Sequence, residues 1–187
     1  MATLFVDKVD PQSGTSLEIG SSGDTITIPS GATITNNGTQ TGFGGVNTPA
    51  FKAKLSDTQT LSNATTTKID FDTEMFDTNG AYDPTTNQRF TVPSGQAGKY
   101  FIYAQVYFDD VASTDAMRRI FIYKNGSEFV ASNTRTVGST GRGSTVTLSD
   151  LIDLSVGEYI EIFGYTNAGS TNLGSGGARF HGYKIIE

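Results

Sequence analysis

The stretch Lys99–Asp109 decides the fold, and it reads Lys-Tyr-Phe-Ile-Tyr-Ala-Gln-Val-Tyr-Phe-Asp. Successive side chains of a β-strand point to opposite faces. One face of this strand is wholly hydrophobic, with Tyr100, Ile102, Ala104, Val106 and Phe108. The other face is mostly aromatic, with Phe101, Tyr103, Gln105 and Tyr107. A strand with one solvated face alternates apolar with polar residues. We therefore expect one face in a sandwich core and the other against a second copy of the chain; cover by the chain's own long loops is the alternative.

Similar segments follow one another over most of residues 50–187. They are Ala50–Leu55, Thr66–Phe71, Gln88–Val92, Met117–Lys124, Glu128–Val137, Ser144–Leu154, Glu158–Tyr165 and Arg179–Ile186. Asn125-Gly126 predicts a two-residue hairpin, and no segment has convincing helical periodicity. The sequence therefore predicts an all-β antiparallel sandwich or jelly roll. Because Ile120–Tyr123 repeats the two-faced pattern, the candidate interface residues are Phe101, Tyr103, Tyr107, Phe121 and Tyr123.

The composition excludes several classes of protein. Among 187 residues, 13 Lys and Arg stand against 19 Asp and Glu, and no basic block occurs, which argues against nucleic-acid binding. Cysteine is absent, so disulfides and thiolate metal sites are excluded. The N-terminus has no charged stretch before a long apolar run, and no stretch approaches the ~20 apolar residues of a membrane span. We expect neither a signal peptide nor membrane insertion.

Residues 1–45 differ in character from residues 46–187, and we expect a boundary near Gly42–Gly45. Short alternating bursts occur at Leu17–Ile19, Thr25–Ile28 and Ala32–Thr35, with turn-forming residues between them. So short a strand buries little surface alone, but three copies wound about one axis would bury their Ile side chains together. The pattern predicts a short β-strand stalk; a disordered linker is the alternative.

Short motifs occur in a fixed order after residue 49, and they carry a resemblance to a known family. They are Ala50-Phe51, Phe76, Asn79, Tyr82-Asp83, Arg89–Pro93, Gly98–Phe101, Lys124–Gly126, Gly157–Ile160 and Phe180–Tyr183. Their order and spacing resemble the C1q/TNF-like trimeric jelly-roll family. The resemblance implies a C1q/TNF-like jelly-roll knob and a homotrimer. Animal members of the family often carry a signal peptide and a collagen-like stalk, and we expect neither in this chain.

The N-terminal segment carries a second resemblance. Thr3–Asp10 looks like the opening of small structural proteins of tailed bacteriophages, and Ile28–Ile34 is similar to phage fibre repeats. This resemblance implies a virion protein whose residues 1–45 dock onto another virion protein.

No specific catalytic constellation is present, and we expect no enzyme and no cofactor. The chain has no nucleophile elbow and no phosphate-binding loop. The single His181 suits a packed or interface position.

Carboxylates cluster at Asp70, Asp72, Glu74 and Asp77, and again at Asp109, Asp110 and Asp115. Paired carboxylates serve glycoside hydrolysis, but the first cluster alternates with apolar residues like the wet face of a strand. Residues 77–83 loosely resemble a calcium loop, although a turn rich in Asx residues fits better. Whether a cation lies on a trimer axis stays open.

Two polar, Gly-rich stretches, Ser132–Ser144 and Thr166–Gly177, are candidate receptor-contact loops. Binding residues concentrate on loops carried by a rigid scaffold. The candidates are Arg135, Arg142, Tyr165, Asn167 and Asn172, which suit a carbohydrate or protein receptor. Plain connectors and contacts between subunits are the alternatives.

Together these features predict a bacteriophage virion protein: a trimeric fibre whose knob attaches to the host cell surface. A capsid decoration or head-fibre protein without receptor binding is the main alternative. A carbohydrate-cleaving depolymerase is a further one.

Overall fold

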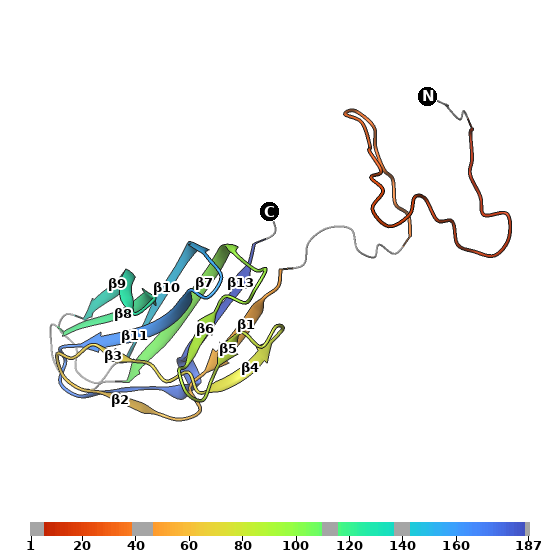
Figure 1. The fold of residues 1–187 in the computed structure, drawn as a ribbon. Coiled ribbons are helices and arrows are strands. Elements are labelled where there is room, and N and C mark those ends of the chain that lie inside the picture. Colours follow the sequence, from red (N-terminus) through yellow and green to blue (C-terminus); the bar gives the residue numbers. More distant parts are fainter. Residues whose placement is uncertain (1–5, 39–46, 110–115, 137–142, 186–187) are drawn as a thin grey trace. The chain divides into compact units, whose positions relative to one another are not determined.

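A computed structural model describes residues 6–38, 47–109, 116–136 and 143–185 of the chain. The chain divides into two units, Met1–Phe43 and Gly44–Glu187. The second unit is a sandwich of two antiparallel sheets (Figure 1), which confirms the all-β prediction. In the part of the chain that the structure describes, no helix is long and apolar enough to cross a membrane.

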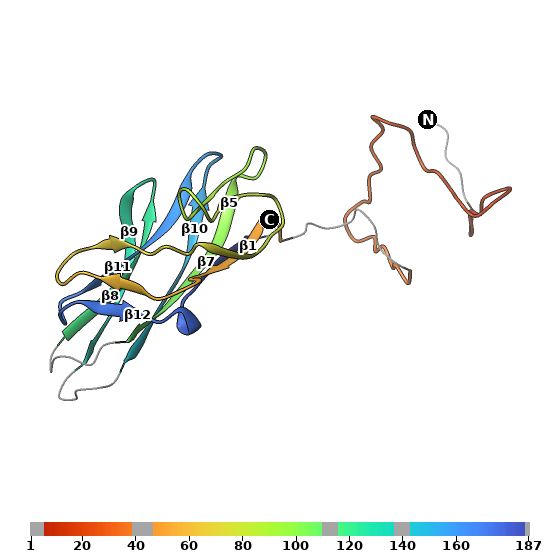
Figure 2. The same ribbon diagram turned by 90° about the horizontal axis from the view of Figure 1, so that it is seen from below.

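The first sheet has β7 (Gly98–Asp109) near its centre. Along one path the order is β2-β12-β7-β13-β1-β4, and β10 pairs with β7 along its whole length. The partners are β1 (Ala50–Lys54), β2 (Gln59–Leu61), β4 (Thr73–Asp77), β10 (Ser144–Leu154), β12 (Thr171–Leu173) and β13 (Arg179–Lys184). A single turn of 3₁₀ helix, Ser175–Gly177, follows β12 and is visible beside it in Figure 2.

The second sheet has the order β5-β6-β11-β8-β9, with β3 paired to β11. Its strands are β3 (Thr67–Lys68), β5 (Tyr82–Asp83), β6 (Arg89–Thr91), β8 (Ala116–Lys124), β9 (Ser127–Thr136) and β11 (Tyr159–Thr166). The β8–β9 hairpin turns at Asn125 and Gly126, whose φ angles are 52° and 77°. Two positive φ angles belong to the type I′ turn that matches the twist of a hairpin, so the predicted hairpin is confirmed.

Both sheets contribute to one hydrophobic core. The inward face of β7 has no exposed area at Tyr100, Ile102, Ala104, Val106 or Phe108. Ile120 and Ile122 of β8 and Ile160 and Ile162 of β11 are equally buried. The alternation in Lys99–Asp109 therefore predicted correctly which face of this strand enters the core.

The structure corrects the prediction at several short strands. β2, β4, β5 and β12 were not expected, and the expected strand Thr66–Phe71 is reduced to β3. β12 lies inside Thr166–Gly177, which we expected to be a loop. These strands have two to five residues and are held by pairing with a neighbouring strand, and β4 has no buried residue. So few residues give too short a run to show the alternation that marks a core strand.

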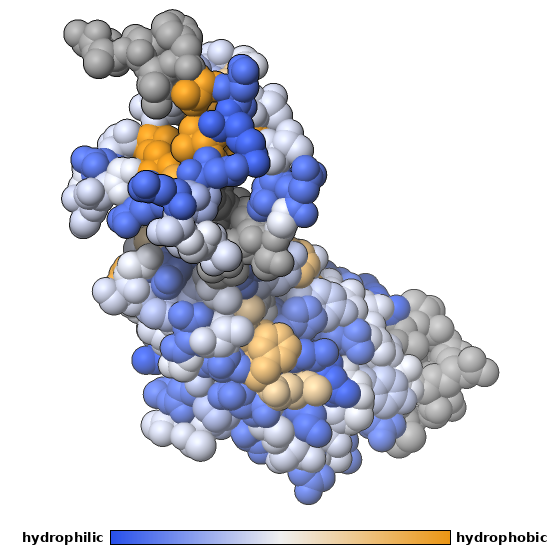
Figure 3. Space-filling view, turned by 90° about the vertical axis from the view of Figure 1, so that its right-hand side faces the viewer, coloured by the Kyte–Doolittle hydropathy of each residue, from blue (hydrophilic) through white to orange (hydrophobic). Residues whose placement is uncertain are grey.

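The first unit contains no strand within residues 6–38. Every residue in this range is exposed except Pro11, which is partly covered. The short strands expected at Leu17–Ile19, Thr25–Ile28 and Ala32–Thr35 are thus not formed in a single copy, because the described unit offers them neither a paired strand nor a core. Figure 3 shows strongly hydrophobic side chains on the surface of this unit. The expected stalk, which needs three copies, stays a prediction.

Candidate subunit interface and binding loops

The outward-pointing side chains of β7 lie beside those of β13, the neighbouring strand in the same sheet. Antiparallel pairing places Tyr183 opposite Phe101 and His181 opposite Tyr103. The Phe101 and Tyr183 ring centroids are 5.5 Å apart, and those of Tyr103 and His181 are 4.7 Å apart with 26° between the ring planes. Paired residues in a sheet carry their side chains on the same face. Phe101 and Tyr103 therefore lie half-buried beside aromatic neighbours.

Two more large hydrophobic side chains extend this face to its edges. Leu151 of β10 pairs with Phe101 and is 60% exposed. Phe76 of β4 pairs with Lys52, which in turn pairs with His181, and Phe76 is 48% exposed. We call this set the outer aromatic face: Phe76, Phe101, Tyr103, Leu151, His181 and Tyr183. Phe101, Tyr103, Leu151, His181 and Tyr183 lie on the adjacent strands β10, β7 and β13, whereas Lys52 of β1 separates them from Phe76 of β4. Exposed apolar side chains gathered in this way on a soluble protein mark contacts with a partner.

A polar chain fixes the middle of the outer aromatic face. The Tyr103 hydroxyl donates a hydrogen bond to Gln105 Oε1 at 2.9 Å, and Gln105 Nε2 donates to the Gly177 carbonyl oxygen at 3.1 Å. Two rotamers are thus held by one network, which lowers the entropy that Tyr103 would lose on meeting a partner.

Tyr107, the third aromatic residue on this side of β7, is covered differently. The Gly174 N–H donates to the Tyr107 carbonyl oxygen at 2.9 Å. A Cβ added at Gly177 would lie 2.6 Å from the Tyr107 Cβ, so only glycine allows this close approach. At Tyr107 the chain's own turn covers the strand, which was the alternative to cover by a second copy.

His181 is a polar residue on the outer aromatic face, and one of its ring nitrogens makes no hydrogen bond to the described residues. Its Nδ1 is buried and has no hydrogen-bond partner among the described residues. Burial lowers the pKa of His181 below its ordinary value, and the nearby Lys52 ammonium lowers it further. The imidazole is therefore held neutral, which suits a packed surface better than a solvated one.

Phe121 and Tyr123 lie on the other layer, on the outward face of β8 in the second sheet. Phe121 is only 2% exposed, and the Arg119 guanidinium carbon lies 4.6 Å from its ring centroid. The Tyr123 ring stacks on Phe163 with centroids 4.1 Å apart. The five interface candidates are therefore not brought together on one face. A closed ring of three joins two different patches of each subunit, so the assignment of both sets to an interface stays a prediction.

The loop candidates have mixed placements. Tyr165 lies in β11, Asn172 in β12 and Arg135 in β9, so these three belong to strands and not to loops. Asn167 Oδ1 accepts a hydrogen bond from the Met117 N–H at 2.6 Å, and Asn172 Oδ1 accepts one from the Thr60 hydroxyl at 2.7 Å. Both amide oxygens are therefore used in hydrogen bonds within the chain: Asn167 is linked to the start of β8, and Asn172 of β12 is linked to β2. Arg142 lies outside the described residues.

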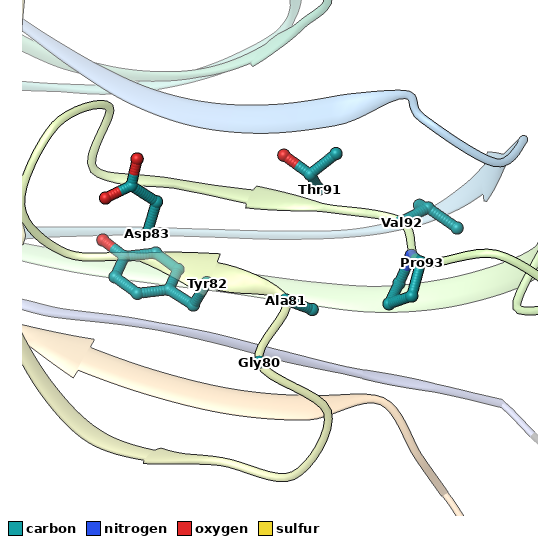
Figure 4. A pocket seen from close by; sticks show the side chains of 7 residues that line it. All are labelled: Gly80, Ala81, Tyr82, Asp83, Thr91, Val92 and Pro93. Atoms are coloured by element: carbon teal, nitrogen blue, oxygen red, sulfur yellow. The ribbon is translucent and has the colours of Figure 1, made fainter.

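A hollow of about 300 Å³ lies beside β5 and β6 (Figure 4). It is lined by Gly80, Ala81, Tyr82, Asp83, Thr91, Val92 and Pro93. The Asp83 carboxylate accepts hydrogen bonds from the Thr86 N–H at 2.9 Å and the Asn87 amide at 2.8 Å. Those bonds hold the pKa of Asp83 well below its ordinary value. The Tyr82 hydroxyl donates to the Phe71 carbonyl oxygen at 2.7 Å. The Asp83 carboxylate and the Tyr82 hydroxyl are thus already used in hydrogen bonds within the chain.

The acidic cluster behaves as a set of turn and strand-end groups. Asp72 accepts hydrogen bonds from the Ser56 N–H at 2.7 Å and the Ser56 hydroxyl at 2.5 Å. Asp77 accepts from the Asn79 N–H at 3.0 Å and the Tyr82 N–H at 2.7 Å, which confirms the Asx-turn interpretation of residues 77–83. Among the residues that the structure describes, no group of three His or acidic side chains is placed to hold a metal ion. Asp110 and Asp115 lie outside those residues.

The second unit has the C1q/TNF-like jelly-roll fold. The globular domain of zebrafish complement 1qA protein is similar with a TM-score of 0.53 and 17% identity, over 73% of this chain and 97% of that chain. Eiger TNF from S. frugiperda gives a TM-score of 0.49 and 12% identity, over 73% of this chain and 91% of that one. No family model and no curated protein matches the sequence. The likeness to the zebrafish domain confirms the predicted jelly roll.

Proposed function

We propose that this chain is a non-enzymatic, homotrimeric binding protein of a bacteriophage virion. Its jelly-roll unit attaches to the host cell surface, and its N-terminal unit docks onto another virion protein. Domains with the C1q/TNF-like fold are generally binding modules, and they usually form homotrimers. The sequence of Thr3–Asp10 and Ile28–Ile34, which resembles phage structural proteins, supports the virion context.

The observation that carries the proposal is the outer aromatic face. Leu151 and Phe76 remain largely exposed at its edges, while Phe101 and Tyr103 are already half-buried and fixed by their neighbours. Burying such side chains stabilises an assembly by roughly 25 cal/mol for each Å² of apolar area. A second copy of the chain is the simplest partner for this surface, because every solution of the protein contains other copies at the concentration of the protein itself.

Three identical subunits also suit attachment. Once one subunit has bound a receptor, the next engagement is intramolecular, so weak single contacts add up to tight binding. Arg135, which is exposed at the end of β9, is a candidate contact for a carbohydrate or protein receptor. Tyr165, which is half-buried in β11, is a second candidate.

Light scattering on the full chain tests the assembly. We expect a particle of three times the 19.9 kDa chain mass at micromolar concentration. A stable particle of one chain mass would refute the homotrimer, and with it the proposed function.

Electron microscopy of intact particles, followed by adsorption of labelled trimer to susceptible cells, tests the role. We expect few copies at a fibre position and saturable adsorption that unlabelled trimer displaces. Many copies over the head with no adsorption to any susceptible host would instead indicate a decoration protein.

A further inference from the structure

The first unit contains a repeat that is present both in its sequence and in its structure. The six-residue motif Ser-Gly-x-Thr-Ile-Thr occurs at residues 22–27 and again at residues 30–35. The two copies are offset by eight residues. An offset this regular points to a structural unit that is used more than once.

Each copy of the motif begins inside the same kind of turn. The Asp24 N–H donates to the Ser21 carbonyl oxygen at 2.9 Å, and eight residues later the Ala32 N–H donates to the Pro29 carbonyl oxygen at 3.1 Å. The third residue of each turn is a glycine with positive φ, 97° at Gly23 and 84° at Gly31. A positive φ at this position belongs to a type II turn, which favours glycine. The turns therefore form within one chain, without help from a partner.

The residues after each turn are suited to strands but have no partner. Thr and Ile are among the residues with the highest strand propensity. Ile26 is 59% exposed and Ile34 is 58% exposed, and Ile28 is also exposed. Side chains two residues apart share one face of a strand, so Ile26 and Ile28 would form one apolar stripe. No described residue of this unit covers that stripe.

The charge pattern indicates which partner would fit. Residues 25–38 contain no charged side chain. When identical strands pair in register, each side chain meets its own copy, and like charges directly opposite destabilise the pair. A charge-free stretch avoids that penalty, and Thr beside Thr and Ile beside Ile are favourable neighbours.

We propose that residues 21–36 are an assembly element that pairs with the same residues of the other copies, each eight-residue repeat adding one turn and one short strand around a common axis. The inference rests on the proposed homotrimer, because a trimeric jelly roll holds the three segments close together. Tethering makes their association intramolecular and offsets the instability of three-residue strands. The Ile stripes of the copies then form a core that one copy lacks.

Amide hydrogen exchange on the full-chain trimer tests the proposal. We expect amides in residues 25–28 and 33–35 to exchange at least about tenfold more slowly than an unstructured chain, because opening would cost about 1.4 kcal/mol or more. The double variant Ile26→Ser with Ile34→Ser replaces the central Ile of each repeat and leaves only Ile28 of the stripe, and we expect exchange there to return to the unstructured rate. The matched control, Thr27→Ser with Thr35→Ser, places the same residue on the other face and is expected to keep most of the protection.

The outcomes separate this inference from the proposed homotrimer. If light scattering shows a trimer while residues 25–35 exchange at the unstructured rate, the assembly element is refuted and the homotrimer stands. If the full chain is monomeric, both fail. Equal loss of protection in the Ile and Thr variants would also refute the proposed Ile core, since burial of the Ile side chains would then not be the cause of the slow amide exchange.

Discussion

The imidazole of His181 lies on the phenol ring of Tyr103, with the two centroids 4.7 Å apart. The two residues are 78 positions apart in the sequence and meet because β13 and β7 pair in register at this point. The stack couples a titratable group to the middle of the outer aromatic face. Stability and assembly are therefore expected to respond to protonation of His181.

Acidification is expected to destabilise the folded chain through His181. Burial is the main cause that lowers its pKa, followed by Lys52, from an ordinary value of 6.5. The unfolded chain then takes up the proton at a higher pH than the folded chain, so stability is full above 6.5 and is lost as the pH falls through the folded pKa. Urea unfolding between about pH 7.5 and about pH 5 measures this.

The variant His181→Phe keeps a ring against Tyr103 and removes the proton site. Its free energy of unfolding should change less over this pH range than that of the parent chain. Asp72 and Glu158 have lowered pKa values and act at a more acidic pH, below ordinary values of 3.8 and 4.5, so they do not obscure the comparison. An identical slope in both proteins would assign the pH dependence to other groups.

Tyr103→Asp is expected to disrupt the trimer. It places a carboxylate in the middle of the outer aromatic face, where burial against a partner removes the charge from water. We expect the trimer to weaken by about 30-fold or more, the effect of losing a hot spot worth about 2 kcal/mol. Sedimentation velocity over a concentration series measures this. Ser127→Asp, in an exposed position at the start of β9, adds the same charge elsewhere and should leave the trimer intact; an unchanged Tyr103→Asp trimer would move the interface to another surface.

Phe180→Ala is expected to cost about 3–5 kcal/mol of stability, the usual range for a buried Phe. The Phe180 ring is 0% exposed and its centroid lies 4.9 Å from that of Phe51 and 5.6 Å from that of Phe71. Phe129→Ala, at a 49% exposed position of β9 outside the outer aromatic face, is the control, and its effect should stay within about 0.5 kcal/mol. Chemical denaturation at one protein concentration compares them. Similar losses at the two positions would mean that the sandwich core is not centred on Phe180.

Removal of residues 1–41 should leave the jelly-roll unit folded. Its core cluster runs from Phe51 to Phe180 and includes no residue of the first unit. The truncated chain should keep the urea midpoint of its folded unit but fail to enter virions, as measured by the protein content of purified particles. Normal incorporation would remove the docking role from the first unit.

The long strands could be predicted because each of their side chains faces either the core or the outside. β10 has the predicted bounds, Ser144–Leu154, and β7 differs by one residue at its start. β4, an edge strand of five residues, and β12, a strand of three residues between β2 and β7, could not be predicted, since strands this short depend on neighbours already in place. Phe76 lies in β4, so its exposed position on the outer aromatic face could not be predicted for the same reason.

The candidate interface was predictable only in part. Alternation alone identified Phe101 and Tyr103 as facing away from the core. It contained no information on which sheet a strand joins, so Phe121 and Tyr123 were grouped with residues of the opposite layer. The contacts of Asn167 and Asn172 were equally hidden, because their partners Met117 and Thr60 are distant in the sequence.

The turn after β12 offers a matched pair of glycines for the last prediction. A Cβ at Gly177 would lie 2.6 Å from the Tyr107 Cβ, whereas a Cβ at the neighbouring Gly176 would meet nothing within 4 Å. Gly177→Ala therefore forces β7 and the turn apart and should cost about 1–3 kcal/mol, as overpacking does. It should also loosen the Gln105 hydrogen bond to the Gly177 carbonyl oxygen, and with it the Tyr103 hydroxyl. Gly176→Ala changes the chain entropy equally without the clash and should be nearly neutral in urea unfolding. Equal stability of the two variants would show that the turn moves freely against Tyr107, and the fixed geometry of the outer aromatic face would then need another source.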